Sequence, residues 1–164
     1  MVTRTGPSRD ASRVAASDGD IIIDVLGPGD LAAVIALDAR VTGSRKPELW
    51  RSFSQAIGAG ELIFLVARVA GEVVGYTVGG VRSWEFGSPP AGWIFAVGVA
   101  PEQREAGVGS LLFAAMTRHF ASCNVRFVRT MLHVDDHLLM SFFRSQGMMA
   151  GPFVELEMPL HDET

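Results

Sequence analysis

The fold is decided by the stretch Val97-Gly98-Val99-Ala100-Pro101-Glu102-Gln103-Arg104-Glu105-Ala106-Gly107-Val108-Gly109-Ser110-Leu111-Leu112. The apolar run that leads into it, residues 93–99, predicts a strand buried on both faces. Pro101 ends that strand, because proline has no N–H group for a ladder. Beyond it, Leu112, Met116 and Phe120 recur at helical spacing. The stretch therefore predicts a strand, a tight turn and a helix.

The turn contains the pattern Arg104-x-x-Gly107-x-Gly109. Glycines let the backbone turn tightly and approach a ligand, and the first N–H groups of a helix have no partner within the helix. The turn therefore predicts a phosphate or pyrophosphate site. Leu112 stands where the dinucleotide fingerprint needs a third glycine, and the Gly-Lys-Ser/Thr triplet of a P-loop is absent from the sequence. The predicted binding residues are Arg104, Glu105, Ala106, Gly107, Val108, Gly109 and Ser110.

Composition narrows the classes of partner. A length of 164 residues with 48% hydrophobic residues suits one domain with a real core. A net charge of -4 argues against a sequence-independent nucleic-acid binder, which needs a basic face. No apolar run is long enough for a membrane span, so neither nucleic acid nor membrane is an expected partner. The single cysteine, Cys123, excludes an internal disulfide, and the four histidines have no ligand spacing, so no metal is expected.

The chain divides into a tail and one domain. Residues 1–19, rich in Ser, Arg, Ala and Gly, are predicted to be a disordered tail, and residues 20–164 a single domain. Apolar periodicity predicts strands and helices in the order β-α-α-β-β-β-α-β-α-β, with Asp30 as the first N-cap. The expected strands are 21–25, 62–67, 73–81, 93–99, 125–133 and 153–158. The fold class is α/β (α+β), a mixed central sheet with helices on both faces.

Both the loop and the element order resemble the GCN5-related N-acetyltransferase (GNAT) family. Arg/Gln-x-x-Gly-x-Gly/Ala between a strand and a helix is similar to that family's coenzyme A pyrophosphate loop. The run Phe142-Phe143-Arg144-Ser145-Gln146-Gly147-Met148 resembles its second landmark, Phe-Tyr-x-x-x-Gly-Phe. The resemblance covers residues 20–160. It implies a cytoplasmic acyltransferase that moves an acetyl group from acetyl-CoA to a primary amine by direct attack in a ternary complex.

The resemblance also implies where acetyl-CoA lies. In the family, the strand before the loop bulges and splays from the next strand, and the pantetheine arm fills the gap. Val97, Gly98 and Val99 occupy the corresponding positions, and Gly98 suits a bulge. A backbone N–H there, of Val97 or Val99, would face the acetyl carbonyl and stabilise the oxyanion. Asp136 and Phe143 are the further expected contacts of the coenzyme.

Two side chains depart from the family pattern. Phe143 stands where a tyrosine often protonates the leaving thiolate, and residues 93–99 contain no carboxylate to act as base. Glu85 is the expected base, acting through water, and His133, expected on the strand across the gap, is the expected acid or base. Cys123 and Ser141 lack the base–orienter pattern of an acyl-enzyme nucleophile. The acceptor site is expected where residues 42–45 meet residues 84–87.

Some alternatives stay open from the sequence. Phe143 and the missing strand carboxylate leave a non-catalytic acyl-CoA-binding module as the second interpretation. A dinucleotide-binding domain is a third, disfavoured by Leu112 and by the antiparallel first half of the chain. The acceptor could be a protein α-amine, a lysine, a polyamine or a drug-like amine. An exposed edge at the last strand would permit a homodimer.

Overall fold

The computed structural model describes residues 19–160. The predicted tail, apart from Gly19, therefore lies outside the described residues. Backbone contacts divide the chain into two compact units, one ending at Met131 and the other beginning at Leu132. Each unit is described by itself below. Over the described residues, no helix combines the length and the apolar character needed to cross a membrane.

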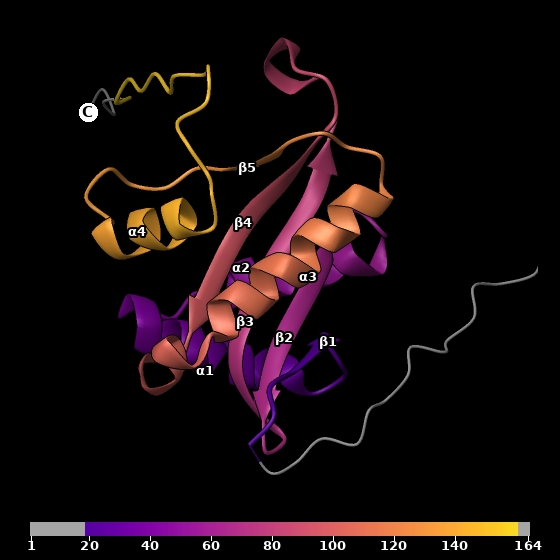
Figure 1. Cartoon of the computed structure of the whole chain (residues 1–164), viewed down its shortest axis with the longest axis vertical. Helices are drawn as coiled ribbons and strands as arrows, with labels where there is room; N and C mark the ends of the chain where they lie inside the picture. The colour runs from indigo at the N-terminus through magenta and orange to yellow at the C-terminus, as the bar shows by residue number, and fades with distance from the viewer. Residues whose placement is uncertain (1–18, 161–164) are drawn as a thin grey trace, which may run out of the picture. The chain divides into compact units, whose positions relative to one another are not determined.

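The first unit is built on a five-stranded sheet with the spatial order β1-β2-β3-β4-β5 (Figure 1). Its first four strands pair antiparallel, and β5 pairs parallel to β4. The mixed sheet is thus confirmed. The fifth strand is much shorter than the predicted 125–133. The strands are β1 (Ile22–Val25), β2 (Ile63–Val69), β3 (Glu72–Arg82), β4 (Ala91–Val99) and β5 (Val128–Thr130).

Helices cover both faces of this sheet, as predicted. The helices α1 (Asp30–Thr42) and α2 (Pro47–Gly58) lie on one face, and α3 (Val108–Ser122) lies on the other (Figure 1). The first face buries a core made mainly of Val34, Leu37, Trp50, Phe64, Val66, Tyr76 and Val78. On the second face α3 buries Leu112, Met116 and Phe120, which recur every four residues along one side of the helix.

Asp30 has a different role from the predicted N-cap. The capping position is Gly29, whose φ of 92° lies in the left-handed region that glycine adopts without steric cost. Asp30 is the first helical residue, and its Oδ2 accepts a hydrogen bond of 2.7 Å from the Gly27 N–H. The same oxygen forms an ion pair with Arg68 of β2. Asp30 therefore ties the start of α1 to the sheet.

Over its described residues, 132–160, the second unit contains one helix, α4 (His137–Ser145). Asp136 caps it, because its Oδ1 accepts a hydrogen bond of 3.0 Å from the Leu139 N–H. Gly147, with a φ of 89°, follows the helix end. The predicted last strand is wrong, since residues 153–158 belong to no strand. Alternating apolar residues indicate a strand only where a partner supplies a ladder, and none pairs with this segment within the described residues.

Candidate functional site

A bulge interrupts β4 at its middle. The β3–β4 register pairs Val78 with Ala96 and then Gly79 with Ile94, so Phe95 is the extra residue. The sequence placed the bulge at Gly98, and this was wrong: Gly98 pairs regularly with Tyr76. A bulge reverses the direction of the peptide groups that follow it, because strand peptides alternate with a period of two.

The hydrogen bonds on either side of the bulge record this reversal. Ahead of it, the Gly92 N–H donates to the Phe127 C=O (2.9 Å) and the Ile94 C=O accepts from Thr130 Oγ1 (2.9 Å), so even-numbered residues face β5. Beyond it, the Ala100 N–H donates to the Val74 C=O of β3 (2.8 Å). The even-numbered residues after the bulge therefore face β3, and Val97 and Val99 turn their N–H and C=O groups toward the β5 side.

On that side β4 and β5 separate. Their parallel ladder ends at the pair Ile94–Thr130. In the first unit, from residue 19 to residue 131, no strand pairs with the β5 side of β4 beyond this point. The outward amide groups of Val97 and Val99 thus line an open edge. Such an edge can bind an extended ligand that carries its own amides, in the manner of an added strand.

The predicted anion loop follows this edge directly. A 3-10 helix, η2 (Pro101–Ala106), leads from β4 into Gly107, which has a φ of 81° and serves as the N-cap of α3. The first hydrogen bond of α3 is Leu111 N–H to Gly107 C=O at 3.1 Å. The N–H groups of Val108 and Gly109 precede that bond, so they point out of the helix end. Arg104 and Glu105 are exposed.

An aromatic pocket lies beside the bulge of β4. Its volume is about 310 Å³, and its walls combine η1 (Glu85–Gly87), the β4 bulge and the end of β5. It is lined by Arg82, Glu85, Phe86, Trp93, Ile94, Phe95 and Met131. The guanidinium of Arg82 lies over the Phe95 ring, 5.1 Å from its centroid, and pairs with Glu85 Oε1 at 3.3 Å.

The loop that forms one wall of this pocket is strained. Trp84 and Phe86 have φ angles of 63° and 56°, in a region that costs a non-glycine residue about 1–2 kcal/mol. Both side chains are exposed, Trp84 at 71% and Phe86 at 74%. Backbone strain combined with exposed aromatic rings favours a binding role for this loop.

Of the two predicted acid–base residues, only Glu85 lies in the aromatic pocket. Glu85 lines the aromatic pocket, beside the bulge. His133 lies beyond β5, in the second unit, so its predicted place on a strand across the gap was wrong. Its ring is exposed, and Nδ1 lies 3.6 Å from Asp135 Oδ2. Asp136 and Phe143 also belong to the second unit. There Asp136 caps α4, and Phe143 packs edge-on against Phe142.

The two loops expected to form the acceptor site lie apart along β3. The loop 42–46 is tied to Asp38, through the Thr42 hydroxyl (2.9 Å to the Asp38 C=O) and Lys46 (3.5 Å to Oδ2). Asp38 in turn binds Tyr76, whereas residues 84–87 follow Arg82. Six residues of strand separate Tyr76 from Arg82, which is about 20 Å. Residues 42–45 accordingly contribute nothing to the aromatic pocket.

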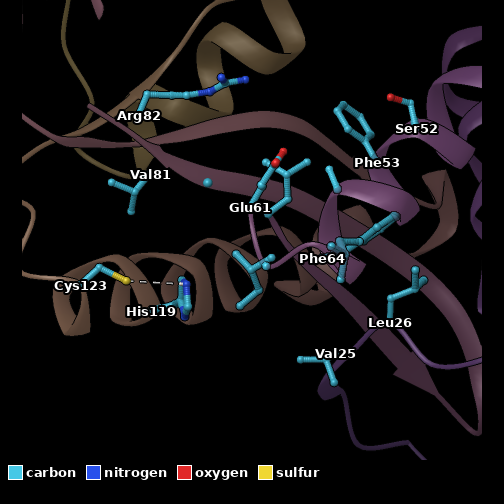
Figure 2. Close-up of a pocket in the computed structure, with 16 residues that line it drawn as sticks. Val25, Leu26, Ser52, Phe53, Glu61, Phe64, Val81, Arg82, His119 and Cys123 are labelled. Carbon is cyan, nitrogen blue, oxygen red and sulfur yellow. Dashed lines mark hydrogen bonds between the residues drawn. The ribbon is translucent and has the colours of Figure 1, made fainter. Parts of the chain in front are cut away.

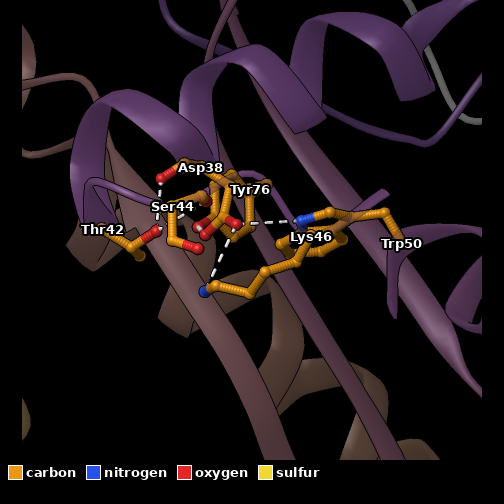
Figure 3. Close-up of polar contacts among 6 residues, drawn as sticks. All are labelled: Asp38, Thr42, Ser44, Lys46, Trp50 and Tyr76. Atoms are coloured by element: carbon orange, nitrogen blue, oxygen red, sulfur yellow. Dashed lines mark hydrogen bonds and ion pairs between the residues drawn. The ribbon is translucent and has the colours of Figure 1, made fainter. Parts of the chain in front are cut away.

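Asp38 is a buried carboxylate that the sequence did not single out. It is 2% exposed and accepts hydrogen bonds from Tyr76 Oη (2.8 Å) and Trp50 Nε1 (3.0 Å) (Figure 3). Burial, then the hydrogen bond to Asp38 and the charge of Asp38, raise the pKa of Tyr76 well above its usual value. This sole tyrosine is sealed in the core at 1% exposure, so it does not replace the missing tyrosine at Phe143.

Gly98 is explained by the same cluster. A Cβ atom at Gly98 would lie 2.5 Å from both Cζ and Oη of Tyr76. The glycine thus leaves room for the tyrosine ring that holds Asp38, on the face covered by α1 and α2. Packing accounts for Gly98, whereas the open edge depends on the neighbouring Val97 and Val99.

A larger cavity, of about 890 Å³, has Arg82 in its lining, as the aromatic pocket does (Figure 2). It is lined by β2, by α2 and by the end of α3, where Cys123 Sγ lies 3.8 Å from His119 Nε2. None of its lining residues belongs to the open edge or the anion loop. Size alone therefore does not make it the reaction site. Over residues 19–160, no group of three His, Cys, Asp or Glu side chains is arranged to hold a metal ion.

The comparisons with known proteins agree with this geometry. The model of the acetyltransferase (GNAT) family matches residues 33–148, so the chain belongs to that family of acyltransferases, whose co-substrate is acetyl-CoA. The matched region contains the open edge and the anion loop. No curated protein sequence matches the chain.

Solved structures of similar fold include two aminoglycoside acetyltransferases and a transcriptional regulator. The aminoglycoside N-acetyltransferase AAC(6')-Iy in complex with CoA has a TM-score of 0.76 at 17% identity, covering 89% of this chain and 98% of its own. The aminoglycoside 6'-N-acetyltransferase AAC(6')-IG from Acinetobacter haemolyticus has a TM-score of 0.74 at 15% identity, covering 86% and 99%. A transcriptional regulator from Bacillus halodurans has a TM-score of 0.73 at 18% identity, covering 86% and 100%.

The described residues fit acetyl-CoA. A side chain at Gly107 would meet nothing within 4 Å, so the space in front of the α3 N-terminus is open to a phosphate. The outward amides of Val97 and Val99 offer hydrogen bonds to an amide-bearing arm. Between Val99 and Phe95, β4 rises about 13 Å, so an extended arm can join the anion loop to the aromatic pocket.

Proposed function

We propose that this protein is an acetyl-CoA-dependent N-acetyltransferase that acetylates a primary amine of a small molecule. The observation that carries the proposal is the continuous path along β4, from the α3 N-terminus through the open edge to the aromatic pocket at the bulge. The two ends of that path suit the two substrates. A pyrophosphate fits the positive helix end, and an amine fits a pocket with a carboxylate and aromatic walls.

Val97 is the proposed oxyanion donor. It is the first residue after the bulge whose N–H group faces the open side of β4. An acetyl group held there would direct its carbonyl oxygen at this N–H group, which would stabilise the negative charge that develops on attack. A backbone donor held in a sheet costs little reorganisation during the reaction.

The proposed reaction is direct transfer. The amine nitrogen attacks the thioester carbon, the new C–N bond forms, the C–S bond breaks, and the sulfur leaves with the electron pair as a thiolate. Holding both reactants in one site can supply about 7–11 kcal/mol of the barrier reduction. Glu85 accepts the amine proton through water, and the leaving thiolate needs no side-chain acid when its proton comes from solvent.

The similar solved structures and the size of the aromatic pocket both favour a small-molecule acceptor. Two similar structures bear the name of aminoglycoside N-acetyltransferases, and the aromatic pocket of about 310 Å³ suits an amine on a small skeleton. We also propose a cytoplasmic location, which the single exposed thiol of Cys123 favours. A homodimer stays a sequence-based proposal.

Release of the CoA thiol in the presence of a panel of primary amines tests this function. We expect turnover that follows the amine concentration, and a loss of about 10²-fold in kcat/KM for Glu85→Gln. The matched control is Glu72→Gln, which removes another exposed carboxylate at the start of β3 and should leave turnover unchanged. Saturable acetyl-CoA binding without turnover of any amine would instead support the non-catalytic module, which Phe143 and the carboxylate-free residues 93–99 favour.

A further inference from the structure

The aromatic pocket already holds a cation of the protein itself. The Arg82 guanidinium lies 5.1 Å from the centroid of the Phe95 ring and 3.3 Å from the carboxylate of Glu85. Phe86 and Trp93 add two further rings to the wall. The face of an aromatic ring carries negative potential and attracts cations, and a neighbouring carboxylate acts in the same direction.

We propose that this pocket is a recognition site for an alkylammonium group, and that Arg82 occupies it until a cationic acceptor displaces the guanidinium. This inference rests on the proposed function and names its substrate class: an amine that arrives protonated on an aliphatic skeleton. The ammonium lies against Phe95 and Glu85 and releases one proton to solvent, which gives the neutral amine that attacks. Glu85 then accepts the second proton through water, as in the proposed reaction.

Displacing Arg82 costs little. Its side chain is 47% exposed and that of Glu85 is 46% exposed, so their ion pair is a solvent-screened contact. Arg82 stands at the last position of β3, where its long side chain can extend into solvent without disturbing the ladder. Trp93 and Phe95, by contrast, stand on β4, whose backbone is held by its ladder with β3.

The opposite interpretation would make Arg82 the receptor for an anionic substrate. The composition of the walls argues against it. An anion at the position of the Arg82 guanidinium would face the Phe95 ring and the carboxylate of Glu85, and both repel it. Only one group of the lining, Arg82, would attract it. Once the Arg82 side chain has turned away, a cation in the pocket is attracted by the same groups that repel an anion.

A ligand-observed NMR titration tests the site without relying on turnover. The probes are choline, whose quaternary nitrogen cannot be acetylated, and 3,3-dimethylbutan-1-ol, a neutral molecule of the same shape. We expect choline to bind the full-length protein and the alcohol to bind at least about threefold more weakly. Arg82→Gln should tighten choline binding roughly threefold to tenfold, and Phe95→Leu should weaken it by a similar factor.

The outcomes separate this inference from the proposed function. Equal binding of the two probes would overturn it, since the pocket would then be merely apolar. Acetate that competes with choline in the wild type but not in Arg82→Gln, or weaker choline binding in Arg82→Gln, would overturn it in favour of an anion site. Thiol release with neutral or anionic amines, combined with no choline binding, would leave the acetyltransferase standing without the ammonium site. Thermal melting of each variant shows whether it is folded.

Discussion

Replacing Gly98 with alanine tests the packing at the centre of the sheet. The added Cβ would lie 2.5 Å from Cζ and Oη of Tyr76 and 2.6 Å from its Cε1. The Tyr76 ring is 1% exposed, stacks edge-on against Trp50 at 5.0 Å, and donates to Asp38 at 2.8 Å. The ring must therefore move by about 1 Å, and this movement breaks its hydrogen bond to a buried carboxylate.

Two costs add in this variant. Overpacking a core costs about 1–3 kcal/mol, and losing a hydrogen bond to a charged group costs about 1.5–3 kcal/mol. A total near 3 kcal/mol or more lowers the Tm by roughly 6–12 °C in a chain of this size. Differential scanning calorimetry measures the shift, with Gly58→Ala as the control, because nothing lies within 4 Å of that added Cβ.

The same variant separates packing from ligand contact. The N–H of Gly98 faces β3, so folded Gly98→Ala should bind acetyl-CoA within about threefold of the wild type. A Tm within about 2 °C of the wild type would refute the packing argument. Lost acetyl-CoA binding at an unchanged Tm would instead return Gly98 to the role predicted from the sequence, a residue of the strand that contacts the pantetheine arm.

Three further predictions concern titratable groups. Tyr76 is the only tyrosine, and its pKa is raised by burial and by Asp38. Absorbance at 295 nm should therefore show no phenolate above pH 10 until the protein unfolds. A phenolate signal from folded protein would contradict this expectation. Because its folded pKa exceeds that of the unfolded chain, stability should fall as pH rises past about 10, and Tyr76→Phe should remove this loss in urea titrations. Partial burial raises the pKa of Asp30, but the hydrogen bonds from Arg68 and Gly27 and the charge of Arg68 outweigh it and lower the pKa below 3.8. The stability that Asp30 contributes is therefore present above about pH 4, and the stability difference from Asp30→Asn should shrink as pH falls below that value; a constant difference would contradict the ion pair.

The sequence predicted the parts of the fold that depend on local signals. The stretch 97–112 indicated a strand, a glycine turn and a helix, and the structure has β4, η2 and α3 there. Pro101 predicted the end of β4, and the apolar spacing of Leu112, Met116 and Phe120 predicted the buried side of α3. Each of these signals acts within a few residues, through dihedral preference or helical spacing.

What the sequence missed depends on pairing between distant residues. The bulge falls at Phe95 rather than Gly98, because the register against β3 decides which residue is extra. Residues 153–158 alternate like a strand, yet an alternating segment forms one only against a partner. Asp38 was not identified from the sequence as a core residue. Its burial follows from Trp50 and Tyr76, which lie 12 and 38 residues away.

The aromatic pocket was predicted in part from local sequence signals, and the rest of it depends on pairing between distant residues. Glu85 and the loop 84–87 were predicted to lie at the acceptor site, and the structure brings Glu85 beside the bulge. Arg82 and Phe95 were not singled out, since each reads as an ordinary strand residue. The one available signal was an arginine three residues before a glutamate, which is too common to identify a site without the fold.

Calorimetric titration of acetyl-CoA into a matched pair of variants tests most directly whether the α3 N-terminus and the β4 edge hold the co-substrate. Gly107 and Gly71 have φ angles of 81° and 82°, and a Cβ on either would meet nothing within 4 Å, so a glutamate strains both positions equally. Only Gly107 faces the anion site. We predict wild-type affinity for Gly71→Glu and a loss of at least about tenfold for Gly107→Glu. Equal affinity in the two variants, with both folded, would contradict the placement of acetyl-CoA at this loop.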